Sequence, residues 1–275
     1  MNQDIFRLDN RVAVITGAAG GIGTAVSHQL GEAGATIIAT DVDPVQLERL
    51  VKELEAKKIK VHAIKSDAGI ESEVISLYEQ AKKLTGKTPQ ILVNNAFQGL
   101  HVAPHETSIS EWSRIMDTSL TGYFLNAREF GKAAIRDRVG GAVVNISSIA
   151  GSSAIGRGNF AYSVAKGGTN QMTRELAIEW ATSKIRVNAI QPCSVNTPGW
   201  RKWVETEGEK AKVLMKRLLE GIPLGRVAEP EDIARGVHFL VSDAAAMITG
   251  VILPIDGGNV AFNAGGNLDR KSTRL

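Results

Sequence analysis

Residues 11–23 read RVAVITGAAGGIG, an apolar run that leads directly into a cluster of glycines. The pattern predicts a strand over Arg11–Thr16, a tight turn, and a helix that continues to Gly34. Glycines allow such a turn to approach a pyrophosphate, which the free N–H groups of the helix N-terminus can bind. The glycines follow G-x-x-x-G-x-G, so the strict G-x-G-x-x-G register does not fit. No Lys-Ser/Thr pair follows, which excludes a nucleotide triphosphatase loop. The turn predicts a dinucleotide site, with an ordinary flexible turn as the alternative.

The next predicted strand ends in an acidic residue, Asp41, about 18 residues beyond Gly23. A carboxylate at this distance can accept hydrogen bonds from the adenosine ribose. It would repel a 2′-phosphate, and no Arg or Lys adjoins it in the sequence. The alternative role is a helix N-cap, but Asp43 before Pro44 fits that role better. Asp41 therefore predicts NAD rather than NADP as the cofactor.

Short apolar runs alternate with helical patterns along the whole chain. A helix over Val45–Lys58, for example, has Val45, Leu47, Leu50, Val51 and Leu54 at helical spacing. Most of the runs are apolar throughout, as in strands that are buried on both faces of a parallel sheet. The expected strands are Arg11–Thr16, Thr36–Thr40, Lys60–Lys65, Gln90–Asn94, Gly141–Ile146, Ile185–Ile190 and Val251–Ile255. We therefore expect an α/β fold: a Rossmann-like, doubly wound parallel sheet of about seven strands with helices on both faces.

One dinucleotide-binding and catalytic domain is expected to span residues 1–275, because no linker or repeat divides the chain. Two segments interrupt the alternation. Phe97–Ser110 is long for a loop between a strand and a helix, and Thr197–Gly221 is a polar helical stretch that contains Trp200 and Trp203. Both follow strands, so both are expected at the carboxyl edge of the sheet, where ligands bind. Residues 197–221 are interpreted as a substrate lid and residues 259–275 as a polar C-terminal tail.

Composition limits the possible partners and locations. The chain of 275 residues has a net charge of +3, too small to indicate a nucleic-acid surface. No apolar run is long enough for a membrane span, and the first residues lack a secretory signal pattern. A single cysteine, Cys193, fits a reducing compartment. We expect a cytoplasmic protein with a small-molecule substrate, and neither a nucleic-acid nor a membrane partner.

A candidate catalytic group lies in the predicted helix that continues to about Trp180. Tyr162 and Lys166 are four residues apart, so their side chains share one helix face. An ammonium beside a phenol favours the phenolate, which lowers the pKa of Tyr162 and lets it act as a general base. The alternative is a solvated lysine over a half-buried tyrosine. Ser148 follows the fifth expected strand and could hydrogen-bond a substrate oxygen.

Taken together, these motifs resemble those of the short-chain dehydrogenase/reductase family. The resemblance rests on Thr16–Gly23, Asn94–Ala96 and Tyr162–Lys166, on Ile248-Thr249-Gly250, and on Asp256-Gly257-Gly258. It covers about residues 8–258, with the motifs in the family's order and spacing. The resemblance implies a homotetramer or homodimer.

The resemblance also implies a role for each matched residue. Tyr162 would be the acid/base, Lys166 would lower its pKa and hold the nicotinamide ribose, and Ser148 would orient the substrate oxygen. The implied cofactor-binding residues are Gly17, Gly21, Ile22, Gly23, Asp41, Asp67, Ala68, Asn95, Tyr162, Lys166, Val195 and Thr197, of which Asp67 and Ala68 would contact adenine and Val195 and Thr197 the nicotinamide carboxamide.

Three positions depart from the family pattern. Phe97 replaces a glycine, which narrows the pocket or shifts the backbone. Ser119 replaces an asparagine whose helix kink supports a proton-relay water, and its hydroxyl could keep the kink by bonding a carbonyl one turn back. We include Ser119 among the catalytic candidates, with a tolerated replacement as the alternative. Cys193 replaces a glycine and is interpreted as an inert packed thiol.

Two histidines, His101 and His105, lie in the loop after Phe97. No metal site is expected, because Pro104 stands between them and no third ligand is evident. They could line the substrate pocket or lie in solvent, and the sequence favours neither.

We expect an oxidoreductase that transfers a hydride between NAD and a secondary alcohol or ketone. The resemblance favours a sugar, polyol or hydroxy acid as the substrate, because the loop after Phe97 contains Gln98 and Glu106 as well as the histidines. One alternative is a reductase of a 3-oxoacyl thioester or a steroid-like ketone. Another is a catalytically silent NAD-binding regulatory protein, which Phe97 and Ser119 suggest and the intact Ser148, Tyr162 and Lys166 oppose.

Overall fold

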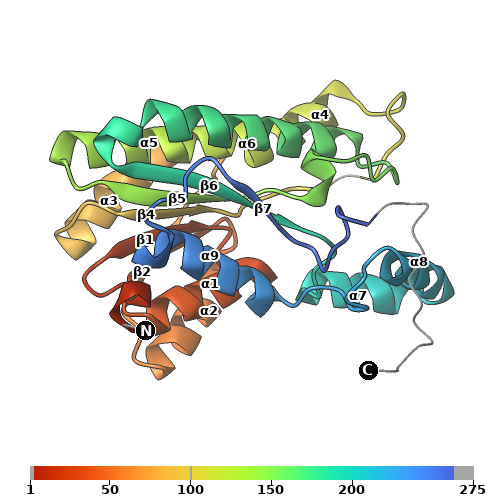
Figure 1. The fold of residues 1–275 in the computed structure, drawn as a ribbon, viewed down its shortest axis with the longest axis horizontal. Coiled ribbons are helices and arrows are strands. Elements are labelled where there is room, and N and C mark those ends of the chain that lie inside the picture. Colours follow the sequence, from red (N-terminus) through yellow and green to blue (C-terminus); the bar gives the residue numbers. More distant parts are fainter. Residues whose placement is uncertain (1–2, 100, 263–275) are drawn as a thin grey trace.

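The computed structural model describes residues 3–99 and 101–262, and its central feature is a parallel sheet (Figure 1). Within these residues seven strands follow the order β3-β2-β1-β4-β5-β6-β7, and every pair is parallel. Val14 of β1 pairs with Ile38 on one side and with Leu92 on the other. The strands are β1 Val12–Thr16, β2 Thr36–Asp41, β3 Val61–Lys65, β4 Ile91–Asn94, β5 Gly141–Ile146, β6 Ile185–Pro192 and β7 Ile252–Ile255. The predicted fold class is confirmed, and the strand ends differ by two residues at most.

Helices cover both faces of the sheet. Figure 1 shows α5 and α6 on one side, and α1, α2 and α9 on the other. The α-helices are α1 Gly21–Glu32, α2 Pro44–Ala56, α3 Glu71–Thr85, α4 Ile109–Met116, α5 Gly122–Asp137, α6 Phe160–Glu179, α7 Pro198–Glu207, α8 Glu209–Glu220 and α9 Pro230–Val241. The shorter helical segments are η1 Gln3–Phe6, η2 Asp117–Thr121, η3 Ile149–Gly151, η4 Ala181–Ser183 and η5 Asp243–Ala245.

Burial on both faces explains why the strands lack an alternating pattern. In β1, Ala13 and Ile15 pack into one apolar cluster with α1 and α9. Val12 and Val14 point the other way, into a second cluster with α3 and α5. Every residue of β1 is buried, so each must be compatible with an apolar layer.

The α2 helix begins where its capping residues predict. The Asp43 carboxylate accepts hydrogen bonds from the backbone N–H groups of Val45 and Gln46, and Pro44 occupies the first turn. Leu50 and the leucines one turn before and after it are buried. Val45 was expected on the same face, but it is 71% exposed because it lies in the first turn, beyond the edge of the sheet-facing stripe.

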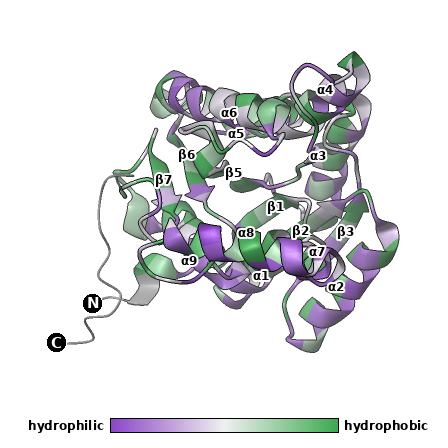
Figure 2. Ribbon diagram, turned by 90° about the vertical axis from the view of Figure 1, so that its right-hand side faces the viewer, coloured by the Kyte–Doolittle hydropathy of each residue, from purple (hydrophilic) through white to green (hydrophobic). Residues whose placement is uncertain are grey.

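The carboxyl ends of the strands lie between two inserted segments. Chain order in the sheet reverses between β1 and β4, which is where a doubly wound sheet opens a crevice. The segments before α4 and around α7 and α8 project from this end (Figure 1). Figure 2 turns this side toward the viewer and shows largely hydrophobic strands between the two helical layers.

The predicted lid over Thr197–Gly221 is two helices rather than one continuous stretch. Gly208 separates α7 from α8 with a φ of +53°, a conformation that glycine adopts at little cost. Of the predicted tail, Asn259 donates a hydrogen bond to the Gly221 carbonyl, and residues 263–275 lie outside the described residues. No helix within residues 3–99 and 101–262 is long and apolar enough to cross a membrane.

Candidate active site

The glycine turn between β1 and α1 is held by its neighbours across the sheet. Gly17 has a φ of +61°, which a residue with a side chain rarely adopts. The Asn95 side chain donates to the carbonyls of Thr16 and Gly17, at 3.1 and 2.9 Å. The Thr16 hydroxyl accepts the N–H groups of Asn95 and Ala96. Asn95 therefore fixes the shape of the turn as well as lining the groove beside it.

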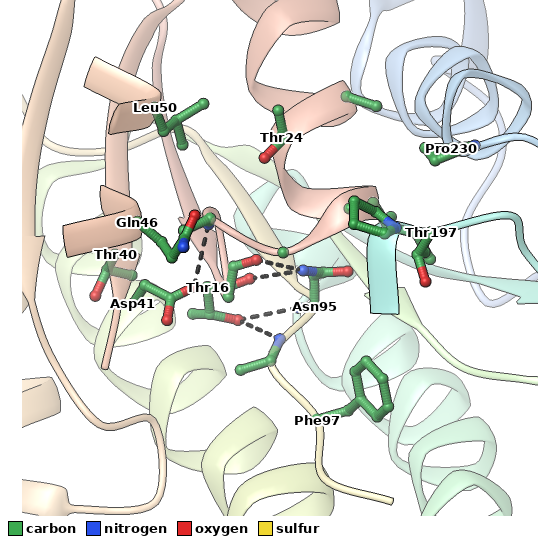
Figure 3. A pocket seen from close by; sticks show the side chains of 18 of the residues that line it. Thr16, Thr24, Thr40, Asp41, Gln46, Leu50, Asn95, Phe97, Thr197 and Pro230 are labelled. Atoms are coloured by element: carbon green, nitrogen blue, oxygen red, sulfur yellow. Dashed lines mark hydrogen bonds between the residues drawn. The ribbon is translucent and has the colours of Figure 1, made fainter. Parts of the chain in front are cut away.

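A cleft of about 1090 Å³ opens beside this turn (Figure 3). Asp41 and Phe97 lie toward opposite ends, with Thr16 and Asn95 between them. The cofactor residues expected from sequence that line the cleft are Gly17, Gly21, Ile22, Asp41, Asp67, Ala68, Asn95 and Thr197.

Four of the expected cofactor residues are not among the residues that line the cleft: Tyr162 and Lys166, described below, and Gly23 and Val195, which lie behind the lining. A Cβ at Gly23 would lie 2.2 Å from the Gly17 carbonyl oxygen, so this glycine allows the helix to pack on the turn. Val195 packs against the core and pairs with Ala228. Gly23 and Val195 can therefore shape the cleft from behind the residues that line it.

Several buried polar atoms of this cleft have no hydrogen-bond partner within the part of the chain that the structure describes. They are His28 Nδ1, Thr40 Oγ1, Ser66 Oγ, Gln98 Oε1 and Asn126 Oδ1. Such groups are costly unless a ligand or water binds them. They fit a dinucleotide, whose ribose hydroxyls and adenine amine need polar partners. Sequence reasoning missed them, although Thr40 is the last residue of one predicted strand and Ser66 directly follows another, where polar residues signal a site.

Asp41 closes the β2 end of the cleft. Its carboxylate accepts backbone N–H groups from Ala19 and Asp43, at 3.1 and 3.2 Å. Three cations also line the cleft: Arg49 pairs with Glu53 at 3.0 Å, Lys57 pairs with Glu32 at 2.9 Å, and Arg201, in the α7 segment, donates to the Asn196 carbonyl at 2.8 Å. Because Arg49 and Lys57 are each paired with a glutamate, neither neutralises the negative charge of Asp41 at the end of β2.

The three expected catalytic residues come together beyond the end of β5. The Ser148 hydroxyl accepts the N–H of Ala150 in η3 and lies near enough to Tyr162 to act on its pKa. Tyr162 and Lys166 lie in the first turns of α6. The Phe97 ring meets the Tyr162 ring edge-on, with centroids 6.2 Å apart. Because Phe97 lines the cleft and Tyr162 does not, this contact places the candidate catalytic phenol next to the cleft rather than in its wall.

The electrostatics of this group differ from the sequence expectation. Burial raises the pKa of Tyr162, and the nearby Ser148 hydroxyl only partly opposes this. Burial also lowers the pKa of Lys166 to about 7. The Lys166 ammonium points to Tyr123 and the Ile146 carbonyl, with Nζ 5.6 Å from the Tyr162 ring centre. In the protein alone, Lys166 therefore does not depress the pKa of Tyr162, because it bonds elsewhere and is only partly charged at neutral pH.

Ser119 lies in the segment that joins α4 to α5. Residues 117–121 form one wide π-helical turn, so the helix is irregular at the position where a kink was expected. The Ser119 hydroxyl does not bond a carbonyl one turn back, as had been expected. It accepts the Gln98 N–H at 3.2 Å, while the Ser119 carbonyl accepts the Thr169 hydroxyl at 3.4 Å. The side chain thus anchors the start of the loop after β4, and its role in proton relay stays a prediction.

Ser119→Ala tests which of these roles matters. Loss of the bond to the Gln98 amide should loosen the loop and raise KM for the alcohol by about fivefold, the equivalent of about 1 kcal/mol. The profile of kcat against pH should keep its shape. A shifted pH profile with an unchanged KM would instead establish the relay role. Ser119→Asn, which restores the family's residue, is the comparison variant.

The loop after β4 is joined to the segment before α6. The Val102 N–H donates to the Gly158 carbonyl, and His101 Nδ1 lies 3.1 Å from the Arg157 carbonyl oxygen. His105 is exposed, and no cluster of metal-ligating side chains occurs in the described ranges. The two loops therefore form one wall next to Tyr162, in which His101 has a structural contact.

The remaining aromatic and sulfur candidates from the sequence pack without a clear chemical role. Phe97 is 60% exposed, so its ring narrows the site rather than filling the core. Trp200 and Trp203 pack on each other in α7, with ring centres 5.1 Å apart. Cys193 is partly buried, and burial raises the pKa of its thiol, as expected for an inert cysteine.

Comparisons with known proteins agree with this geometry. Residues 17–259 match the family model described as enoyl-(acyl carrier protein) reductase. The chain is 37% identical to cis-4-hydroxycyclohexanecarboxylate dehydrogenase of Sinomonas cyclohexanicum, over 91% of this chain and 97% of that protein. It is 36% identical to the L-tagatose-forming galactitol 2-dehydrogenase of Cereibacter sphaeroides, over 93% and 97%.

A solved structure shares both the fold and much of the sequence. It is provisionally described as a 2-deoxy-D-gluconate 3-dehydrogenase from Agrobacterium tumefaciens and contains bound NADP. The TM-score is 0.85 at 31% identity, over 94% of this chain and all of the other. The similarity therefore extends over the strands, the cleft and the inserted segments.

Proposed function

This chain belongs to the short-chain dehydrogenase/reductase family, and on that premise we propose that it is an NAD-dependent dehydrogenase that interconverts a secondary alcohol and its ketone. One observation carries the proposal. Ser148, Tyr162 and Lys166 converge beyond β5, and Phe97 joins Tyr162 to the cleft that the glycine turn borders.

Each of these residues has a defined task in the proposed reaction. The Ser148 hydroxyl holds the substrate oxygen and stabilises the charge that develops on it. Tyr162 Oη takes the alcohol proton during oxidation and returns it during reduction. Lys166 supplies a positive charge near the phenol when protonated and, by resemblance, holds a ribose. The nicotinamide, when bound, supplies the hydride acceptor or donor.

Both NAD and NADP are nicotinamide cofactors, and we propose NAD because of Asp41. Asp41→Ala should raise kcat/KM with NADP⁺ relative to NAD⁺ by about tenfold, because it removes the charge that repels a 2′-phosphate. Steady-state kinetics with both cofactors measure this ratio. Asp43→Ala is the matched control: it removes the α2 cap, costs about 1 kcal/mol of stability, and should leave the ratio unchanged. A wild-type preference for NADP⁺ would contradict the assignment.

A sugar, polyol or hydroxy acid is the proposed substrate. The relatives named for galactitol and hydroxycyclohexanecarboxylate support this class. Reduction of a 3-oxoacyl thioester or steroid-like ketone is the second candidate, favoured by the description of the matching family model. An initial-rate screen of sugars, polyols, hydroxy acids and hydroxyacyl thioesters separates the two. Activity on thioesters alone would overturn the assignment of a sugar, polyol or hydroxy acid. No turnover of any compound would favour the alternative of a catalytically silent NAD-binding protein.

We propose that the chain forms a homotetramer or homodimer. A second groove on the outer side of α5 and α6 supports self-association, since Phe124 and Ile135 are exposed beside Leu176 and Trp180 there. A sedimentation mass near 29.4 kDa, that of a single chain, would refute this.

The single cysteine supports the proposal of a cytoplasmic location. We also propose that residues 1–275 form one domain, in which residues 197–221 are a lid over the substrate site.

A further inference from the structure

A second tyrosine, Tyr123 in α5, contacts the proposed catalytic lysine. Its side chain is fully buried, directly after the π-helical turn. The Tyr123 hydroxyl donates to the Ile146 carbonyl at 3.0 Å and accepts from Lys166 Nζ at 3.0 Å. Lys166 Nζ also donates to the same carbonyl, at 2.6 Å. The phenol, the ammonium and the end of β5 therefore form a closed triangle of hydrogen bonds.

The surroundings of Lys166 provide no negative charge to compensate its burial. The side chain is 1% exposed, and no carboxylate within the described ranges forms an ion pair with it. The ammonium nitrogen lies 4.6 Å from the ring centre of Tyr123 and 5.6 Å from that of Tyr162. Two rings, one hydroxyl and one carbonyl thus stabilise the cation.

Few groups next to Lys166 can ionise and so affect its charge. α5 contributes Tyr123, α6 contributes Tyr162, and β5 contributes the neutral Ile146 carbonyl. The π-helical turn contributes Ser119, which is uncharged and reaches α6 through Thr169. Burial raises the pKa of Tyr123 well above its usual value, so its phenol stays protonated in the working range of pH. Its oxygen is therefore a permanent neutral acceptor for the lysine.

We propose that Tyr123 is a positioning residue for the reaction: its hydroxyl fixes the Lys166 amine between α5 and β5 and favours the charged form. An ammonium has three N–H donors, and the triangle uses two of them. The third remains for the group that Lys166 holds during catalysis. This inference rests on the proposed function for its kinetic consequence, whereas the effect on Lys166 is a property of the protein alone.

Tyr123→Phe isolates the hydroxyl, because phenylalanine keeps the ring, its packing and its contact with the cation. The loss of an acceptor for a buried ammonium should lower the pKa of Lys166 by about one unit. The measurement is an NMR titration of protein labelled with ¹³Cε-lysine, in which the signal missing from Lys166→Met identifies the residue. We expect the wild-type signal to titrate near pH 7 and the Phe variant to titrate at lower pH.

Tyr78→Phe is the matched control. Tyr78 is also a buried tyrosine, but its hydroxyl has no hydrogen-bond partner in the described residues, and it lies on the buried face of α3, in the second apolar cluster. Its removal should leave the Lys166 titration unchanged. Thermal unfolding of both variants checks that each is folded. Should Tyr123→Phe not fold, Tyr123→Met fills the space with a flexible apolar chain and undergoes the same titration.

The kinetic consequence depends on pH with a fixed sign. If the pKa of Lys166 is lowered further, its amine loses its charge at a lower pH. The loss of activity in Tyr123→Phe, relative to wild type, should therefore grow as pH rises. In kcat/KM for NAD⁺, which reports groups of the free enzyme, we expect Tyr123→Phe to be near wild type at pH 5. The deficit should reach about fivefold at pH 7 and about tenfold at pH 8.

The outcomes separate this inference from the proposed function. An unchanged or raised Lys166 pKa in Tyr123→Phe overturns the inference, as does a lowered pKa with a wild-type kinetic profile. A lowered pKa together with a deficit that grows with pH supports it. If the wild type turns over no substrate while the titration shifts as described, the contact between Tyr123 and Lys166 stands and the proposed function fails.

Discussion

Tyr162→Phe should lower kcat by about 10²–10⁴-fold while the affinity for NADH stays within about twofold of wild type. General acid–base catalysis contributes a factor of this size, and phenylalanine has no proton to exchange. The ring remains, so the edge-on contact with Phe97 and the packing beside the cleft are preserved. Initial rates and fluorescence titration with NADH measure the two quantities.

Tyr78→Phe, which removes a buried hydroxyl away from the site, is again the matched control and should keep full activity. Retained turnover in Tyr162→Phe would show that another group exchanges the proton. The pH dependence gives a second check. Because burial raises the pKa of Tyr162, its phenolate forms only at alkaline pH in the free protein. Oxidation should therefore accelerate at alkaline pH, and the loss of charge on Lys166, which in the free protein begins near pH 7, should reduce the size of that acceleration.

Gly23→Ala should have the second largest effect, through the shape of the cofactor turn. The added Cβ would lie 2.2 Å from the Gly17 carbonyl oxygen and 2.7 Å from the Cα of Ala18, so the backbone must move. Overpacking of this kind costs about 1–3 kcal/mol. We expect a lower Tm and at least about a tenfold loss of NADH affinity, because 1.4 kcal/mol corresponds to tenfold.

Gly20→Ala provides the control within the same turn. Its added Cβ would lie 3.4 Å from the Gly17 carbonyl oxygen, an ordinary contact, and Gly20 has an extended backbone with a φ of −76°. Calorimetry with NADH and thermal unfolding should show this variant close to wild type. Equal losses in both variants would mean that any side chain in the turn is disruptive and that the close approach at Gly23 has no special role.

The fold could be predicted because its strands are buried on both faces. Most of the seven runs are apolar without alternation, the clearest exception being the edge strand β3, and the structure contains all seven within two residues of the expected ends. Helix ends followed from local chemistry, as at Asp43 and Pro44. The break at Gly208 was missed because a glycine inside a polar helical pattern is compatible with either one helix or two.

The candidate site was predictable at residues that lie at strand ends or belong to a sequence motif. Asp41 and Ser148 follow strand ends, and Tyr162 and Lys166 share a helix face. Tyr123 was missed because an aromatic residue in a predicted helix looks like core, and only the three-dimensional structure brings its hydroxyl to a lysine 43 positions away.

The pKa of Tyr162 was predicted with the wrong sign. Helical spacing places Lys166 on the same face but does not determine which acceptors its amine selects. Burial, which acts on both groups, also depends on packing between elements that are distant in the sequence. Spacing alone therefore locates a candidate catalytic pair without giving its protonation states.

The most direct test of this account is the initial rate of NADH formation by the wild-type protein, with NAD⁺ and a panel of sugars, polyols, hydroxy acids and hydroxyacyl thioesters. We expect at least one sugar, polyol or hydroxy acid to be oxidised, faster with NAD⁺ than with NADP⁺. The reverse reaction with the matching ketone should consume NADH. No turnover in either direction by a protein that binds NADH in calorimetry would contradict the account and identify a catalytically silent nucleotide-binding protein.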